Sequence, residues 1–182
     1  PGIPVVCTGI NPPLPVLQVS GELNAKVYRR GIDFDLARDP EAGGGMLQFS
    51  SGSGTIRVQS PSMAGAHQLD NLATALAAFE LLNPGGFASA GKIPAAVSNT
   101  RVPGRLQRVH AKPEILLDVG HNELAAQVVA DFLQLDKRPA VICVLAMLAD
   151  KPAEKVANVF ANVCRNWLCA DSPGARGQSG EA

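Results

Sequence analysis

Several stretches of this sequence place polar side chains where they could bind a nucleotide. In LLDVGHN, residues 116–122, an apolar run ends in Asp118, and His121 and Asn122 follow just before a helical pattern begins at Glu123. Ligands of open α/β sheets bind beyond the carboxyl ends of strands, where a carboxylate can accept hydrogen bonds from a ribose diol. The structural alternative is that Asp118 caps a turn and Asn122 caps the next helix, and for Asn122 the cap is the favoured interpretation.

Two further stretches suit other parts of a nucleotide. VPGR, residues 102–105, is a Pro-Gly turn followed by Arg105, whose planar guanidinium matches phosphate oxygens. HQLDN, residues 67–71, places His67 and Asn71 on one face at a helix start, where the amide of Asn71 could make paired donor and acceptor contacts with an adenine edge. Taken alone, both patterns also have an ordinary explanation: a solvated surface arginine and a polar first helical turn.

A lysine and a glycine-rich stretch complete the candidates. Lys151, in MLADKP, follows an apolar strand, and its ammonium could bind a substrate carboxylate or simply be solvated at a helix start. GFASAGK, residues 86–92, has the spacing of a P-loop, but Ile93 stands where Mg²⁺ binding needs Ser or Thr, and Pro94 follows. No strand precedes this stretch, so we expect no phosphate loop there and no metal ligands among the candidate residues.

The elements that must position these residues differ between the two halves of the chain. The first half predicts a short buried strand in residues 3–9, a helix in 16–24, a strand in 25–36, a hairpin in 46–60 turning at Ser-Gly-Ser-Gly, and helices in 67–82 and 93–100. In the helix expected over residues 67–82, Leu69, Leu72, Leu76 and Phe79 form an apolar stripe, and Asn-Pro-Gly-Gly ends it.

From residue 106 onward, strands and amphipathic helices alternate. The expected strands are 106–110, 114–120, 140–148 and 166–170, and the expected helices are 123–135 and 152–163. Continuous apolar strands alternating with such helices predict a Rossmann-like α/β fold, with a mainly parallel sheet covered by helices on both faces. We therefore place a domain boundary after residue 101, which gives domains 1–101 and 102–182.

The composition excludes several classes of protein. Sixteen acidic and sixteen basic residues cancel, so no basic field would gather nucleic acid or anionic lipid, and 4% aromatic residues leave few stacking platforms for single strands. The longest apolar run, 140–149, is too short to cross a bilayer. The four cysteines show no C-x-x-C spacing, which favours a reduced, cytoplasmic protein.

Four stretches together carry a resemblance to a known family. HQLDNLATALAAFELL, VPGRLQRV, ILLDVGHNELAA and VLAMLADKPAEKV, in this order and spacing, resemble the bacterial bifunctional dihydrofolate synthase/folylpolyglutamate synthases, the folate branch of the Mur ligase superfamily. WLCADSPGARG, residues 167–177, fits the segment that follows in that family. The resemblance covers the chain from about residue 1 to its end and is strongest over residues 65–177.

The resemblance implies an ATP-dependent ligase that phosphorylates the carboxylate of dihydropteroate or tetrahydrofolate and joins it to L-glutamate through an acyl phosphate. Transferred to this sequence, Asn71 would contact adenine, Arg105 the phosphates during catalysis, and Asp118 the ribose, while His121 belongs to the same nucleotide-binding motif. Lys151 would lie near the incoming glutamate. The family also implies a cytoplasmic enzyme, expected to be a monomer, that uses ATP with Mg²⁺.

The same resemblance implies that important parts lie outside these residues. The P-loop and Mg²⁺ ligands of the central ATPase-type domain should precede Pro1, and the last strands and helices of the C-terminal domain should follow Ala182. The 182 residues alone are therefore expected to be inactive. Two alternatives remain open: a cell-wall or cyanophycin-type ligase of the same superfamily, and a nucleotide-binding module without catalysis.

Overall fold

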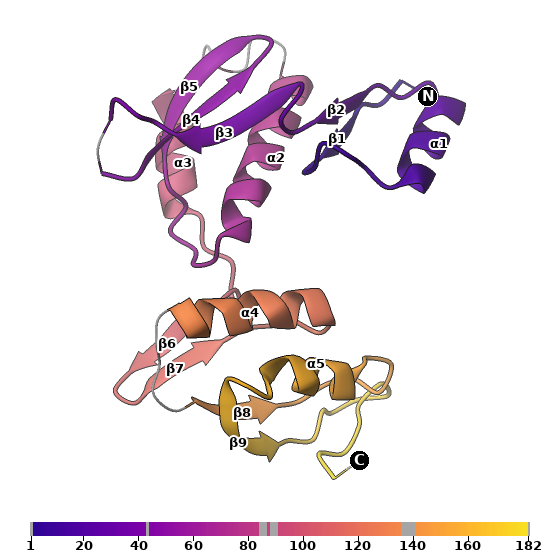
Figure 1. The fold of residues 1–182 in the computed structure, drawn as a ribbon, viewed down its shortest axis with the longest axis vertical. Helices are drawn as coiled ribbons and strands as arrows, with labels where there is room; N and C mark the ends of the chain where they lie inside the picture. Colours follow the sequence, from indigo (N-terminus) through magenta and orange to yellow (C-terminus); the bar gives the residue numbers. More distant parts are fainter. Residues whose placement is uncertain (1, 43, 84–86, 88–90, 136–140, 182) are drawn as a thin grey trace. The chain divides into compact units, whose positions relative to one another are not determined.

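The computed structural model describes residues 2–42, 44–83, 87, 91–135 and 141–181 and divides into two compact units, Pro1–Val102 and Pro103–Ala182 (Figure 1). The first unit contains β1 (Val5–Cys7), α1 (Leu14–Glu22), β2 (Val27–Arg29), β3 (Phe34–Arg38), β4 (Met46–Ser51), β5 (Gly54–Gln59), α2 (His67–Leu82) and α3 (Ile93–Asn99). The second contains β6 (Gln107–Ala111), β7 (Glu114–Leu117), α4 (Glu123–Leu135), β8 (Val141–Leu145), α5 (Ala153–Phe160) and β9 (Cys164–Cys169).

The first unit is built from two small sheets and the helices α1, α2 and α3. Strands β1 and β2 pair in parallel, and β3, β4 and β5 form an antiparallel sheet with β4 in the centre. Alternate residues of this sheet face the helices, because successive side chains of a strand point to opposite faces. The core that results is Phe34, Leu36, Leu47, Phe49, Val58, Ala73, Leu76, Ala77 and Val97.

The hairpin and the helices of this unit confirm their predictions, with one change of detail. β4 and β5 join through Gly52 and Ser53, as the Ser-Gly-Ser-Gly pattern predicted. Of the expected apolar stripe of α2, Leu76 is buried but Phe79 is 40% exposed. Ala73 and Ala77 lie in the core instead, because small side chains let the helix approach the sheet closely.

The single strand expected over residues 25–36 is wrong. The segment forms β2 and β3, which belong to different sheets and are separated by a turn. Gly31 adopts φ +80° in this turn, and the carboxylate of Asp33 accepts a hydrogen bond from the backbone N–H of Arg29 at 2.8 Å. Ile32, Phe34 and Leu36 alternate with polar residues from inside the turn into β3, so the apolar pattern does not show where the turn ends.

The second unit confirms the α/β class. β6 and β7 form an antiparallel hairpin, β8 and β9 pair in parallel, and α4 spans the predicted residues. Its core consists of Ala126, Ala130, Leu133, Met147, Val156, Phe160 and Cys164. Within the described residues the strands make two two-stranded sheets rather than one continuous sheet.

The two faces of the β8–β9 pair differ. Cys143, Leu145 and Trp167 pack against the core shared with α4 and α5. On the other face Ile142 is 61% exposed and Val144 is 67% exposed. The continuous apolar run predicted burial of both faces, whereas the described helices pack against one.

Two expectations fall largely outside the described residues. Of the stretch GFASAGK only Phe87, Gly91 and Lys92 are described, and of the Asn-Pro-Gly-Gly stop only Asn83. Helix α2 does end at Leu82, one residue before that stop.

Candidate functional site

Asp118 holds the end of β7 against the turn that precedes β6. Its Oδ2 accepts a hydrogen bond from the backbone N–H of Leu106 at 2.9 Å, and its Oδ1 accepts one from the N–H of Gly120 at 2.7 Å. The N–H of Val119 also donates to the carbonyl of Gly104 at 2.9 Å. Residues 103–106 and 118–120 therefore form one structural corner, named here the Asp118 corner.

Asp118 does cap a turn, which is the structural alternative that the sequence offered. Its carboxylate nevertheless keeps free acceptor positions. An ionised carboxylate offers about four lone-pair positions, and the two backbone donors occupy two of them. Asp118 is only partly buried, so the remaining positions can accept hydrogen bonds from a ligand. The ribose contact stays a prediction.

The turn before β6 directs Arg105 outward. Gly104 has φ +70°, and a Cβ built on it would lie 2.5 Å from Cγ1 of Val119, so only glycine fits there. Leu106 adopts φ +43° and is 6% exposed, which places its side chain in the interior. Arg105, between these two residues, is exposed. Because the N–H of Leu106 is bonded to Asp118, the chain positions Arg105 and Asp118 at the same corner.

His121 and Asn122 play different parts in the loop that leads to α4. Asn122 accepts a hydrogen bond at its Oδ1 from the N–H of Ala125 at 2.9 Å, which confirms it as the N-cap of this helix. His121 is exposed, and its Nδ1 lies 3.2 Å from the carbonyl of Val119. His121 therefore lies at the edge of the Asp118 corner, where its side chain is accessible to solvent.

Asn71 lies in the first turn of α2, in the other compact unit. Its Nδ2 donates to Oε1 of Gln68 at 3.2 Å, and Nε2 of Gln68 lies 3.0 Å from Nε2 of His67. Asn71 is exposed, whereas Gln68 is only 4% exposed. His67 Nδ1 is buried and has no hydrogen-bond partner among the described residues. The sequence pattern indicates His67 and Asn71 but not Gln68, because only its burial in the folded chain distinguishes Gln68 from other glutamines near helix starts.

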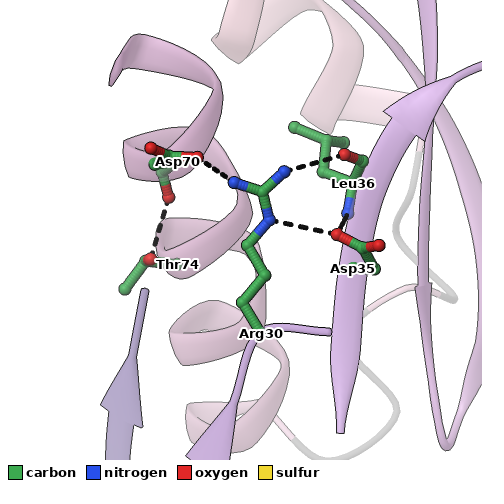
Figure 2. A network of polar contacts seen from close by, with 5 residues as sticks. All are labelled: Arg30, Asp35, Leu36, Asp70 and Thr74. Carbon is green, nitrogen blue, oxygen red and sulfur yellow. Dashed lines mark hydrogen bonds and ion pairs between the residues drawn. The ribbon is translucent and has the colours of Figure 1, made fainter. Parts of the chain in front are cut away.

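Arg30 fixes the helix that carries Asn71 (Figure 2). Its guanidinium bonds to Asp70 in the first turn of α2, to Oδ1 of Asp35 at 3.0 Å, and to the carbonyl of Leu36 at 3.0 Å. The side chain of Arg30 is 20% exposed, so solvent screens these contacts less than those of a free surface pair. The neighbour of Asn71 is thereby tied to the start of β3, which sets the position of the helix start.

Lys151 belongs to a group of three charged residues, named here the Lys151 clasp: Asp150, Lys151 and Arg176. Nη2 of Arg176 donates to both carboxylate oxygens of Asp150 at 2.8 Å, and Nζ of Lys151 lies 3.2 Å from Oδ2. The Arg176 guanidinium, helped by the Lys151 ammonium, holds the pKa of the Asp150 carboxyl below its ordinary value. Two cations on one carboxylate leave the clasp with positive charge that a substrate carboxylate could neutralise.

Arg176 was not selected from the sequence, since it is 26 residues from Asp150. The signal that could have found it is the WLCADSPGARG stretch, which was noted only for its resemblance. The backbone supports the contact, because the N–H of Ala149 donates to the carbonyl of Arg176 at 2.9 Å.

Thiol and metal chemistry find no support in the described part of the chain. Burial raises the pKa of the Cys143 thiol to about 12, and burial also raises the pKa of Cys164, so neither is an activated nucleophile. No group of three or more His, Cys, Asp or Glu side chains that could hold a metal ion occurs among the described residues. Across the same residues, no helix has both the length and the apolar character that crossing a membrane requires.

The structure thus brings Arg105, Asp118 and His121 together in the second unit. That unit also carries Lys151, in the loop after β8, while Asn71 lies on α2 in the first unit. The second unit offers one guanidinium, one carboxylate with free acceptor positions and one cationic clasp, and the first unit, taken by itself, offers one amide. These are groups that bind phosphates, hydroxyls, a base edge and a carboxylate.

Comparison with known proteins shows which proteins this chain is similar to. Residues 104–182 match the family described as Mur ligase, glutamate ligase domain. The dihydrofolate synthase/folylpolyglutamate synthase of Escherichia coli is 29% identical over 93% of this chain and 38% of its own length. The protein of the same name from Haemophilus influenzae is 28% identical over 98% of this chain and 43% of its own length.

Solved structures agree over nearly the whole chain. E. coli FolC in complex with DHPP and ADP matches with a TM-score of 0.82 at 26% identity, over 98% of this chain and 41% of that chain. A bifunctional folylpolyglutamate synthase/dihydrofolate synthase with Mn, AMPPNP and L-glutamate bound matches with a TM-score of 0.79 at 25% identity, over the same shares. The chain therefore spans less than half the length of these relatives. Residues 104–182 are thus similar to the glutamate ligase domain of the Mur ligases, and nearly the whole chain is similar to part of the dihydrofolate synthase/folylpolyglutamate synthases.

Proposed function

We propose that this chain is part of an ATP-dependent ligase that adds L-glutamate to dihydropteroate and to folates. The observation that carries the proposal is the match, over 98% of the chain, to structures described with ADP and DHPP and with Mn, AMPPNP and L-glutamate. Residues 1–101 would be the end of the central ATPase-type domain, and residues 102–182 the glutamate-binding domain. The division into compact units after Val102 supports this assignment.

The reaction would proceed in two transfers. The γ-phosphoryl group of ATP passes to a carboxylate oxygen of the folate precursor, which gives an acyl phosphate and ADP. The amine of L-glutamate then attacks the acyl carbon, phosphate leaves with the bond electrons, and the amine loses a proton. Such transfers depend on positioning and on neutralising the charge of the phosphoryl oxygens. Mg²⁺ would neutralise part of that charge, and its ligands would lie outside the described residues.

The side chains of the Asp118 corner suit the nucleotide in this scheme. Asp118 would accept hydrogen bonds from the ribose hydroxyls, since two of its acceptor positions are free of backbone donors. Arg105 would neutralise phosphate charge, because its exposed guanidinium leaves the same corner. His121 would line the rim of this site. Asn71, on α2, would make paired contacts with the adenine edge.

The Lys151 clasp suits the carboxylates of the incoming glutamate. Lys151 would bind a carboxylate as a point charge, while Asp150 and Arg176 hold the loop in place. The four cysteines are free thiols, which supports a cytoplasmic location. We further propose that the complete protein acts as a monomer.

The proposal is tested with the complete gene product that contains these residues. Sustained ADP release should require both dihydropteroate and L-glutamate, and mass spectrometry should show a product heavier by one glutamyl group. The 182-residue chain alone should release no ADP, since it contains no phosphate loop that we recognise. Turnover with muramyl peptides and not with pteroate would instead indicate a cell-wall ligase, and ATP binding without turnover of any acceptor would indicate a non-catalytic module.

A further inference from the structure

We propose that Gln68 is a positioning residue that sets the orientation of the Asn71 amide and thereby makes the nucleotide site select adenine over guanine. The inference rests on the proposed function, because it takes Asn71 to contact the base. It concerns a residue that would not itself touch the nucleotide.

The burial of Gln68 is the first observation. Its side chain is 4% exposed in the first turn of α2, three residues before the exposed Asn71. Burial of a primary amide is unfavourable unless its polar atoms are hydrogen-bonded. Both polar atoms of the Gln68 amide have a partner. Oε1 accepts a hydrogen bond from Asn71 at 3.2 Å, and Nε2 lies 3.0 Å from Nε2 of His67.

The second observation is that these contacts have one direction. Nδ2 of Asn71 donates to Gln68, and the amide nitrogen of Gln68 then faces Nε2 of His67, to which it donates in the tautomer that leaves this ring nitrogen unprotonated. Turning the Asn71 amide by itself would bring its carbonyl oxygen against that of Gln68, where neither can donate. Reversal therefore requires Asn71, Gln68 and His67 to change together, whereas an isolated exposed asparagine turns freely.

The consequence for a bound base follows from the remaining groups of Asn71. One N–H of its amide is committed to Gln68, which leaves the other N–H and Oδ1 facing outward as a fixed donor and acceptor pair. Adenine presents an amino donor beside a ring-nitrogen acceptor and matches that pair. Guanine presents a carbonyl oxygen in place of the amino group, so its oxygen would face Oδ1 of Asn71.

The start of α2 is also held in place by a residue outside the helix. A fixed orientation of the Asn71 amide can therefore discriminate between bases. Arg30 ties Asp70, the residue before Asn71, to Asp35 and Leu36 (Figure 2). A base-edge contact discriminates only when its donor and acceptor cannot move to suit another base.

The decisive measurement is the ratio of the dissociation constants for GTP and ATP in the complete protein, obtained by calorimetry. Gln68→Met keeps the length of the side chain but removes its donor and acceptor, and we expect the ratio to fall about tenfold, mainly through weaker ATP binding. Gln68→Glu still accepts from Asn71 and should keep the ratio within about threefold of wild type. His67→Leu removes the partner of Nε2 and should give an intermediate ratio.

The controls separate positioning from general damage. Gln127→Met makes the same change at a helical glutamine that donates to Asp131, and it should leave the ratio unchanged. Asn71→Ala should abolish the discrimination, and adding Gln68→Met to it should change nothing more, because the two residues act in series. In turnover, Gln68→Met should raise KM for ATP and leave KM for L-glutamate unchanged.

The inference is overturned if Gln68→Met weakens ATP and GTP binding equally, or if Gln68→Glu loses discrimination as Gln68→Met does. An Asn71→Ala protein that still discriminates would also overturn it, because Asn71 would then not contact the base. Since the readout is nucleotide binding, these results stand apart from the ligase assay. Tight, selective ATP binding without glutamate ligation would reject the proposed function and retain the role of Gln68.

Discussion

The Asp118 corner and the Lys151 clasp lie in the same compact unit, but different kinds of contact hold them. Asp118 is fixed by two backbone N–H groups, from Leu106 and Gly120. The ammonium of Lys151 is held through side chains, since Asp150 bridges it to Arg176, although the backbone of Ala149 also bonds to that of Arg176. A carboxylate held by the backbone keeps its place when nearby side chains change, whereas a clasp of exposed charges depends on each partner and on ionic strength.

The two sites should therefore differ in how well they tolerate substitutions. The corner requires a glycine at position 104 and a carboxylate at 118, so most substitutions there should affect folding as well as binding. The clasp should lose function with little loss of stability. Trp167, the one tryptophan of the sequence, packs on Phe160 with ring centroids 6.2 Å apart, so its fluorescence reports the unfolding of the unit that holds both sites.

The largest effect is expected from Gly104→Ala. The new Cβ would meet Cγ1 of Val119 at 2.5 Å on a backbone with φ +70°, so the substitution adds both a clash and left-handed strain. We expect the free energy of unfolding to fall by about 3 kcal/mol. Urea titration followed by Trp167 fluorescence measures it.

Asp118→Asn is the next largest change and tests whether the backbone holds the corner. An amide nitrogen cannot accept, so one of the two bonds from Leu106 and Gly120 must be lost. A loss of about 2 kcal/mol in unfolding free energy is expected, together with weaker ATP binding by the complete protein. Unchanged stability would show that the two backbone contacts do not hold the corner.

Asn122→Ala should have a smaller effect. It removes the side-chain acceptor for the N–H of Ala125 at the start of α4 but leaves Asp118 and its partners in place. We expect the unfolding free energy to fall by about 1 kcal/mol, as measured by the same urea titration. ATP affinity of the complete protein should stay within about twofold of wild type, and a larger loss would mean that Asn122 also contacts the nucleotide.

The smallest effect on stability is expected from Arg176→Gln, which opens the Lys151 clasp. The pKa of Asp150 lies below its ordinary value of 3.8 because of Arg176 first and Lys151 second. Since the folded pKa is depressed, the stabilisation is present above 3.8 and is lost as the pH falls below it. In the variant, an NMR titration of the Asp150 carboxyl should move toward 3.8.

The same variant separates the two sites by function. KM for L-glutamate of the complete protein should rise, while ATP affinity should not change, because the Asp118 corner is intact. A clasp whose opening alters ATP binding and leaves KM for glutamate unchanged would contradict the assignment of Lys151.

Local patterns predicted several parts of the fold correctly. The hairpin at Gly52–Ser53, the span of α4 and the cap at Asn122 were all expected, because each depends on contacts within a few residues along the chain. The α/β class followed from the alternation of apolar strands and amphipathic helices. The division of residues 25–36 into two strands was missed, because the apolar alternation of β3 already begins at Ile32, inside the turn.

Local sequence patterns were limited in the same way for the candidate functional residues. Asp118 and Arg105 could be selected by type and position, and the structure places them at one corner, but their roles with a nucleotide remain proposals. Gln68 and Arg176 were not selected. Burial of a helix-start glutamine and pairing across 26 residues are properties of the folded chain, not of any local pattern.

The sequence by itself determined where the helices and the hairpin form and which chemical groups stand at the strand ends. Only the tertiary structure decided that Asp118 is held by Leu106, that Asn71 is oriented by a buried Gln68, and that Arg176 joins Lys151 through Asp150. The physical reason is the distance along the chain between the residues that interact. Helix caps and tight turns are set by backbone geometry over a few residues, whereas the partner of a carboxylate or a buried amide depends on which distant segment packing brings within hydrogen-bond distance.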